Sequence, residues 1–381
     1  MKYSRILITG GAGFVGSSLS LALLNKGYEV TVLDNLSEQI HGKDAKACSS
    51  LFLSIKDKVN FIKGSVADYA IFQTAVRGQQ AIIHLAAETG TGQSMYQISQ
   101  YSHVNMQGTA NLLDILANDR HEVEKVVVAS SRAIYGEGKY VNGGGDYFYP
   151  GHRLDIRLSR GDFELYNEET QEQLYPVATD ESALIHPSSV YGITKQYQEQ
   201  MVMTICPTLG IKPVAFRYQN VYGPGQSLNN PYTGILSIFS NLIRNQQTIN
   251  IFEDGQESRD FVYVDDVVEA TILGLEREEA NNQVYNVGTG QRTTVLAVAK
   301  MLMANYGTEV PLNISGNYRM GDIRHNFADI TKLKEQLGFS PCVSFSDGLQ
   351  HFTDWVKDQR LLDQSQYEYS LNVMREKHMF K

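Results

Sequence analysis

The stretch ILITGGAGFVGSSL, residues 6–19, places four glycines within seven residues directly after an apolar run. The run predicts a buried strand, and the glycines stand at its junction with a helix. Gly10, Gly13 and Gly16 form a GxxGxxG pattern. Glycines at such places permit a tight turn, the approach of a phosphate to the backbone, and close packing of helix against strand. We therefore expect the free N–H groups at the helix N-terminus to face a pyrophosphate.

Similar apolar runs recur along the chain. They lie at 5–9, 28–33, 59–62, 81–86, 125–130, 212–217 and 283–290. Continuous β-branched runs suit strands that are buried on both faces, and the helical patterns between them imply a parallel sheet. The sequence therefore predicts an α/β fold in which a Rossmann-type, doubly wound parallel sheet is joined to a smaller C-terminal α+β domain.

The second apolar run ends at Asp34. An acidic side chain at this place takes the hydroxyl groups of an adenosine ribose. A carboxylate about 4 Å from a 2′-phosphate would be unfavourable by ~1 to 4 kcal/mol, so the residue favours NAD over NADP. The alternative is that Asp34 only caps the turn after it. Asp68 stands where it could contact the adenine or, equally, cap a helix.

Composition excludes several classes of partner and site. The 381 residues include 33 Lys and Arg against 42 Asp and Glu, a formal charge of −9, which argues against general binding to nucleic acid or anionic membranes. Cys48, Cys206 and Cys342 lie far apart, so we expect buried thiols and neither a metal site nor a disulfide framework.

The N-terminus lacks the apolar run of a signal peptide, and no segment is long enough to span a membrane. We expect a cytoplasmic protein.

Changes in composition also suggest domain boundaries. We assign residues 1–220 and 257–290 to an NAD-binding domain and residues 221–256 and 291–381 to a substrate-binding domain. Residues 137–185, rich in Gly, Tyr, Glu and Arg, interrupt the first of these as an insertion. The insertion is a surface elaboration, a lid or an oligomer contact. The polar tail after about residue 361 is expected to be a surface helix or arm.

The stretch SSVYGITKQYQE, residues 188–199, carries a possible general base. Tyr191 and Lys195 are four residues apart and would share one face of a helix that begins at Ser188 or Ser189. A phenol titrates near 10 unaided, but a neighbouring ammonium and the helix dipole favour the phenolate. Tyr191 would then act as a general base, unless the two residues are only a surface pair.

Ser130 and Ser131 end the predicted strand at 125–130, on the side of an open α/β sheet where ligands bind. A hydroxyl there could bond the reacting oxygen, although serine is also common in turns.

Taken in order, these motifs resemble the extended short-chain dehydrogenase/reductase family, in its NAD-dependent sugar-nucleotide epimerase/dehydratase branch. Further matches are HLAAET (84–89), VNMQGT with Asn105, RYQNVYGPG (217–225), RDFVYVDD (259–266), YNVGTG (285–290) and RMGDIRHNFAD (319–329). The resemblance covers roughly residues 5 to 350. It implies that Tyr191 takes a proton from the sugar 4-hydroxyl while hydride passes to NAD, that Lys195 holds the nicotinamide ribose, and that Ser131 bonds the same oxygen.

The resemblance also implies two sets of binding residues. Those expected to bind NAD are Gly10, Gly13, Phe14, Val15, Gly16, Asp34, Asn35, Val66, Asp68, Leu85, Ala86, Ala87, Asn105, Ser130, Tyr191, Lys195 and Tyr218. Those expected to bind the nucleotide-diphosphate sugar are Glu88, Thr89, Ser131, Arg132, Asn220, Phe252, Arg259, Arg319 and Asp322. Each charged residue of the second set could instead be solvated, and Phe252 could belong to the core.

The two residues after Ser131 narrow the choice of reaction. Dehydratases of the branch carry an Asp-Glu pair there, and this chain has Arg132 and Ala133. We therefore expect a 4-epimerase that passes through a 4-keto sugar, acting on a dTDP- or UDP-linked hexose or 6-deoxyhexose. The alternatives are a 4,6-dehydratase or 4-keto reductase and, least favoured, a non-catalytic NAD-binding module.

The motifs NPYTGILSIF (230–239) and IFEDGQESRDF (251–261) resemble most a dTDP-L-rhamnose 4-epimerase subgroup. The family implies a homodimer formed through two helices from each subunit, one of them the Tyr191 helix, and a role in polysaccharide biosynthesis.

Overall fold

The computed structural model describes residues 2–228, 230, 234–360 and 365–381, so residues 231–233 of the motif at 230–239 and residues 361–364 of the tail lie outside it. A seven-stranded sheet with the strand order β14-β9-β5-β4-β1-β2-β3 forms its centre. The strands are β1 (Arg5–Thr9), β2 (Glu29–Asp34), β3 (Asn60–Lys63), β4 (Ala81–His84), β5 (Lys125–Ser131), β9 (Lys212–Tyr218) and β14 (Gln283–Val287). All six neighbouring pairs are parallel, which confirms the predicted Rossmann-type sheet.

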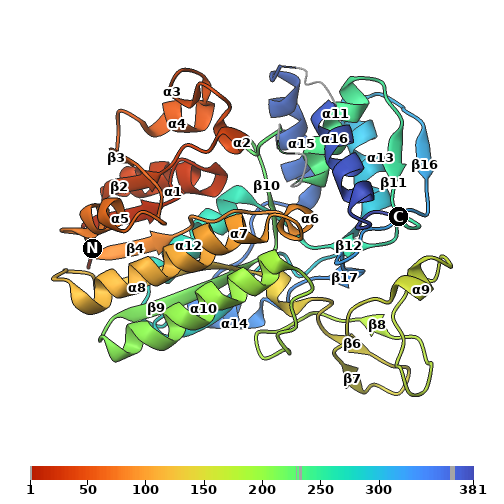
Figure 1. Cartoon of the computed structure of the whole chain (residues 1–381), viewed down its shortest axis with the longest axis horizontal. Coiled ribbons are helices and arrows are strands. Elements are labelled where there is room, and N and C mark those ends of the chain that lie inside the picture. The colour runs from red at the N-terminus through yellow and green to blue at the C-terminus, as the bar shows by residue number, and fades with distance from the viewer. Residues whose placement is uncertain (1, 229, 231–233, 361–364) are drawn as a thin grey trace.

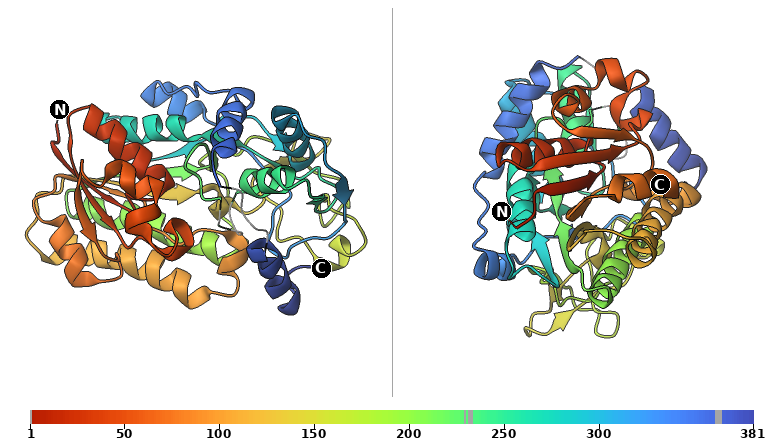
Figure 2. Two further views of the ribbon diagram at one scale, coloured as in Figure 1. Left: turned by 90° about the horizontal axis from the view of Figure 1, so that it is seen from above. Right: turned by 90° about the vertical axis from the view of Figure 1, so that its left-hand side faces the viewer.

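Helices cover both faces of this sheet (Figures 1 and 2). One layer contains α1 (Phe14–Asn25) and α12 (Val264–Glu276), and the other contains α5 (Tyr69–Val76), α8 (Gly108–Asn118) and α10 (Val190–Thr208). Ile6 and Ile8 belong to the core on the α1 side, whereas Leu7 between them belongs to the core on the α10 side. Successive strand residues point to opposite faces, so both faces of β1 need apolar side chains, and the apolar run supplies them.

The second part of the chain packs against the end of the sheet. Its main elements are α11 (Ile235–Arg244), β11 (Ile249–Ile251), α13 (Val295–Tyr306), β16 (Leu312–Ile314) and α15 (Phe345–Lys357). One hydrophobic cluster contains Val127 from the sheet together with Phe239 and Phe352 from this second part. The two parts therefore share a core, and the assigned domain boundaries stay a prediction.

The predicted insertion forms a small antiparallel sheet of its own, from β6 (Tyr140–Val141), β7 (Tyr147–Phe148) and β8 (Tyr175–Pro176), with a short helix α9 (Asp155–Leu158). Tyr140, Leu165 and Leu174 are buried together in it. Figure 1 shows this unit below β17 (His325–Asn326), apart from the central sheet.

The smaller elements connect these layers. They are α2 (Glu38–His41), α3 (Ala45–Cys48), α4 (Ser50–Ile55), α6 (Thr91–Ser94), α7 (Ile98–Tyr101), a π-helical turn (Ser102–Gln107), a 3₁₀ turn (Arg132–Tyr135), β10 (Asn220–Tyr222), β12 (Ser258–Arg259), β13 (Phe261–Tyr263), β15 (Thr293–Thr294) and α14 (Thr331–Leu337). Strand β10 pairs in parallel with β13, and β12 lies between β15 and β17.

Two expectations about the chain's surface need correction. The tail forms helix α16 (Ser365–Glu376), so the expected helix is present and the arm is not, and the helix is packed through Leu371 and Met374, which are buried in a cluster with Phe252. Of the three thiols only Cys206 is buried. Cys48 and Cys342 are exposed, because they lie in short surface connections instead of the core.

No helix within the described ranges combines the length and the apolar character that crossing a bilayer would require.

Candidate active site

The glycine-rich loop joins β1 to α1 through backbone that tolerates no larger residue at two points. Gly10 has φ +69°, and a Cβ there would lie 2.9 Å from the backbone of Ala86. A Cβ on Gly16 would lie 2.2 Å from the carbonyl oxygen of Gly10. The loop therefore keeps bare backbone at the N-terminus of α1, where N–H groups without helical partners can bind an anion.

Asp34 links this loop to the end of β2. Its two carboxylate oxygens accept hydrogen bonds from the backbone N–H groups of Ala12 (3.0 Å) and Leu36 (2.8 Å). Burial raises the pKa of the carboxyl, and these hydrogen bonds and nearby His41 oppose that shift. A carboxylate has about four acceptor positions, so capacity remains for ribose hydroxyl groups. The turn-capping and ribose-binding interpretations of Asp34 are therefore compatible.

A cavity opens beside the loop. Of the residues expected to bind NAD, those that line it are Gly10, Gly13, Phe14, Val15, Gly16, Asp34, Asn35, Val66, Leu85, Ala86 and Ala87. Ser37, Gln39 and His41 also line it and were not anticipated. None of its described lining residues is Lys or Arg. A pyrophosphate would thus be held by neutral donors, and a 2′-phosphate would find Asp34 and no cation, so the cavity fits NAD.

Five residues expected to bind NAD line neither this cavity nor the one that adjoins it. One is Lys195 on α10, and the other four are Asp68, Asn105, Ser130 and Tyr218. The Asp68 carboxylate caps α5 by accepting the N–H of Ile71 (3.1 Å), which was the alternative for this residue. Asn105 clamps the backbone of Glu88, accepting its N–H at 2.7 Å and donating to its carbonyl at 3.1 Å.

Tyr218 and Ser130 are the other two. The Tyr218 hydroxyl bonds the Thr271 hydroxyl at 2.7 Å inside the core. Ser130 is buried, and its Oγ has no hydrogen-bond partner among the described residues. Neither side chain faces the cofactor cavity, because the end of a strand buried on both faces turns alternate residues away from the ligand.

Helix α10 presents Tyr191 in its first turn. The Oγ of Ser189 caps the helix by accepting the N–H of Gly192 at 3.1 Å, and the N–H of Tyr191 is itself bonded to the Ser94 hydroxyl at 3.0 Å. Burial raises the pKa of the Tyr191 phenol, while a hydrogen bond with Ser131 and the charge of Arg132 lower it. The reactive phenol is thus flanked by a hydroxyl and a guanidinium.

Lys195 lies on the same helix, and its expected roles at Tyr191 and at the nicotinamide ribose stay predictions. Its Nζ donates to the carbonyl of Ala129 on β5 at 2.9 Å, and burial lowers its pKa to about 7. The charge of Arg132, which the sequence placed only at the substrate, lowers the pKa of the phenol. Spacing along a helix predicts a shared face, but the direction of a long side chain depends on the strands beneath it.

A second cavity adjoins the first, sharing Phe14, Thr89 and Gln226 with it. It is lined by Tyr191 and by all but one of the residues expected to bind substrate: Thr89, Ser131, Arg132, Asn220, Phe252, Arg259, Arg319 and Asp322. The exception, Glu88, lines the cofactor cavity. Residues from 89 to 322 in the sequence are therefore brought to one site.

Three arginines give this second cavity its positive charge. The Nε of Arg132 donates to the Asn220 side chain at 3.0 Å. The guanidinium of Arg259 is fixed by the carbonyls of Ser258, Ile323 and Arg324 at 2.6–2.9 Å. Arg319 lies 4.8 Å from the ring centre of Phe252, and its Nε is buried without a described partner. Guanidinium groups held in this way suit a diphosphate.

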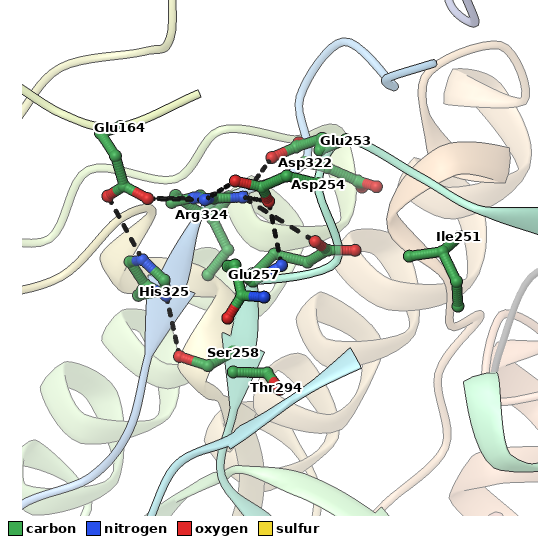
Figure 3. A network of polar contacts seen from close by, with 12 residues as sticks. Glu164, Ile251, Glu253, Asp254, Glu257, Ser258, Thr294, Asp322, Arg324 and His325 are labelled. Atoms are coloured by element: carbon green, nitrogen blue, oxygen red, sulfur yellow. Dashed lines mark hydrogen bonds and ion pairs between the residues drawn. The ribbon is translucent and has the colours of Figure 1, made fainter. Parts of the chain in front are cut away.

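Beneath the arginines, a charged network joins the insertion to the cavity wall (Figure 3). Arg324, fully buried, contacts Glu164 of the insertion at 2.6 Å, Asp254 at 2.7 Å and Glu253 at 2.9 Å. Arg153, also from the insertion, pairs with Glu253 at 2.7 Å. The insertion therefore supports the segment that carries Phe252 and Arg259.

Glu257 and Tyr367 are among the lining residues of the second cavity that sequence reasoning missed. Burial, and then the charge of Glu253, raise the pKa of Glu257 to about 7. Its Oε2 lies 3.8 Å from Nη1 of Arg324 without forming a hydrogen bond to any described residue. No local pattern singles out either residue, because each reaches the cavity only through long-range packing.

Comparison with known proteins matches this geometry. The model of the NAD dependent epimerase/dehydratase family matches residues 6–150 and 164–288, leaving a gap inside the insertion. A dTDP-L-rhamnose 4-epimerase from Burkholderia thailandensis is 36% identical over 357 residues, covering 93% of this chain and 95% of the relative.

Two solved structures share the fold over most of the chain. A UDP-glucose 4-epimerase from Thermotoga maritima, with UDP-glucose, gives a TM-score of 0.73 at 29% identity and covers 93% of this chain and 98% of its own. A UDP-glucose 4-epimerase from Thermus thermophilus, in complex with NAD, gives a TM-score of 0.73 at 28% identity. The match covers 93% of this chain and 100% of the Thermus chain. With the family match spanning the glycine loop and the Tyr191 helix, this chain belongs to the NAD dependent epimerase/dehydratase family.

Proposed function

We propose that this chain is an NAD-dependent sugar-nucleotide 4-epimerase that acts on a dTDP- or UDP-linked hexose or 6-deoxyhexose. The observation that carries the proposal is the position of Tyr191 and Ser131 in a cavity with three arginines, next to a cavity built for a dinucleotide. The arginines suit the diphosphate of the substrate, and the phenol suits a hydroxyl group that must lose its proton.

NAD, when bound, accepts the hydride from the sugar C4 and returns it. The Oη of Tyr191 takes the proton of the 4-hydroxyl and later gives it back. Ser131 Oγ already accepts the N–H of Ala133 at 3.1 Å, so its own hydrogen is left to be donated to the Tyr191 oxygen or to the reacting oxygen of the sugar. Arg259 and Arg319 hold the diphosphate, whereas Arg132 lies beside Tyr191, so the sugar is left free to present either face.

Epimerisation is favoured over dehydration by the two residues after Ser131. Elimination of water needs an acid and a base beside the sugar. Ala133 has no ionisable group, and Arg132 is a cation whose Nε is engaged by Asn220. A 4-keto reductase remains an alternative that shares the first half of the reaction. A non-catalytic module is disfavoured, since it would have no use for a buried Tyr191 next to Ser131.

The purified protein should be incubated with UDP-, dTDP-, GDP- and CDP-sugars without added cofactor, and the products followed by proton NMR. We expect inversion at C4 of one or more UDP- or dTDP-sugars. Formation of a 4-keto-6-deoxy product that absorbs in alkali would contradict the proposal and identify a dehydratase.

Tyr191→Phe should lower kcat by about 10²-fold to 10⁴-fold, the usual contribution of a general base, while NAD stays bound. Tyr197→Phe, on the same helix but outside both cavities, is the matched control and should keep full activity. Unchanged turnover in Tyr191→Phe would rule out the assigned role.

The proposal extends to a cytoplasmic homodimer that binds neither nucleic acid nor membrane and serves polysaccharide biosynthesis. The formal charge of −9 supports the exclusion of polyanions. Ile193 on α10 is 49% exposed, which supports a subunit contact through that helix. Light scattering coupled to gel filtration measures the oligomeric state, and a monomer would contradict the proposed homodimer.

A further inference from the structure

The C-terminal strap, residues 367–381, is tied to the wall of the substrate cavity by backbone hydrogen bonds. The N–H groups of Tyr318 and Met320 donate to the carbonyls of Lys381 (2.9 Å) and Met379 (2.9 Å), and the N–H of Lys381 donates to the carbonyl of Tyr318 (3.1 Å). These bonds flank Arg319, one of the three cavity arginines. The strap is therefore part of the wall that positions Arg319.

Apolar contacts hold the strap to the same wall. The rings of Phe380 and Phe252 are 4.9 Å apart, and Leu371 and Met374 are buried in the same cluster. On the opposite side the strap reaches α6, where a Cβ on Gly92 would lie 3.3 Å from Met374 Sδ. Thr91, next to Gly92, lines the cavity, as does Phe252. The strap thus contacts both the sheet domain and the second part of the chain at the edge of the cavity.

The strap contributes Tyr367 to the lining of the cavity. Burial raises the pKa of this phenol, and the charges of Arg319 and Arg375 only partly offset that effect, so the hydroxyl stays protonated at neutral pH. Tyr367 is a neutral aromatic side chain in the cluster with Phe252, whereas Tyr191, Ser131 and Arg132 form the reacting end.

We propose that Tyr367 is a nucleoside-binding residue that packs against the base and ribose of the nucleotide, so that the C-terminal strap completes the nucleoside end of the substrate site. This inference rests on the proposed function. An aromatic ring beside a guanidinium suits a planar base, because bases stack on aromatic side chains and on arginine alike. Phe252 alone serves that purpose poorly, since Arg319 lies over its ring and Phe380 packs against it.

The test is calorimetric titration of the NAD-loaded protein with UDP and with dTDP. Tyr367→Ala should raise Kd for both diphosphates about tenfold, the loss expected when one stacked aromatic is removed. Tyr369→Ala is the matched control, because Tyr369 lies on the same helix, is 66% exposed and does not line the cavity. It should leave Kd unchanged.

Tyr367→Leu keeps an apolar side chain in the cluster, so the variant should keep the melting temperature of the wild type. Its affinity for UDP and for dTDP should still be lower than that of the wild type. Wild-type affinity in a folded Tyr367→Ala or Tyr367→Leu protein would overturn the inference and leave the proposed function intact. A defect confined to whole sugar nucleotides, with UDP and dTDP bound normally, would place Tyr367 at the sugar and also overturn it. Failure of the unaltered protein to bind either diphosphate would overturn both.

Discussion

At the scale of single residues, the proposed chemistry depends on how the Tyr191 phenol loses its proton. Burial raises the pKa of Tyr191, and the Ser131 hydrogen bond and the Arg132 charge lower it. Loss of solvation and, to a smaller extent, the charge of Arg259 lower the pKa of the half-buried Arg132 guanidinium to about 9, so it remains a cation at neutral pH. The charge of Arg132 therefore favours the Tyr191 phenolate, and the role predicted for Lys195 stays a prediction.

Arg132→Met should move the acid limb of the kcat profile toward higher pH by about one unit, because the phenolate loses a nearby positive charge. The measurement is kcat at saturating substrate between pH 6 and 10. Arg319→Met is the control, since Arg319 lines the same cavity without acting on the phenol, and it should raise KM with no shift of the limb. An unshifted limb in Arg132→Met would show that another group sets the acidity of Tyr191.

At the scale of elements, the insertion acts as a support for the substrate cavity. Burial would raise the pKa of Glu164, but hydrogen bonds from His325 and Arg324 hold it at about 2 against an ordinary value of 4.5. A carboxyl with a lowered pKa stabilises the fold above its unfolded pKa. That stabilisation is lost as the pH falls from 4.5 toward 2.

Glu164→Gln should reduce the free energy of unfolding at pH 7 by about 2 kcal/mol, allowing for partial exposure and for the other partners of Arg324. Urea titration at pH 7 and at pH 3 measures the free energy of unfolding. The difference in this free energy between wild type and variant should be smaller at pH 3 than at pH 7. Glu169→Gln, an exposed residue of the same insertion, should change nothing. An equal gap at both pH values would contradict the role of the ionised carboxyl.

At the scale of the whole molecule, one hydrophobic cluster runs from the central sheet into α13 and α15. A shared core couples the unfolding of both parts. Phe352→Ala, in α15, should lower the free energy of unfolding of the protein by about 3 to 5 kcal/mol. It should lower the melting temperature of the sheet domain as well. Trp355, the single tryptophan, reports on α15, and release of NAD reports on the sheet domain. The two transitions should coincide, and separate transitions would contradict a common core.

Local patterns predict much of this molecule and fail in definable places. The glycine spacing, the apolar runs and the serine cap of the Tyr191 helix are local features, and each lies where it was expected. The arginines reach one cavity as the motif order implied. Tyr367 and Glu257 could not be found, because their place depends on how the chain's last helix and a short strand pack. The contact of Lys195 with a carbonyl on β5 could not be predicted either, because it depends on the packing of α10 against the sheet.

Asp34 has a consequence for anyone who wishes to redesign this protein for a phosphorylated dinucleotide. Its carboxylate anchors both the glycine loop, through Ala12, and the bend after β2, through Leu36. Exchanging it for a small neutral residue would admit the extra phosphate and at the same time release two anchors of the loop that must receive it. A change of preference from NAD to the phosphorylated dinucleotide would therefore require a compensating substitution that restores those two hydrogen bonds.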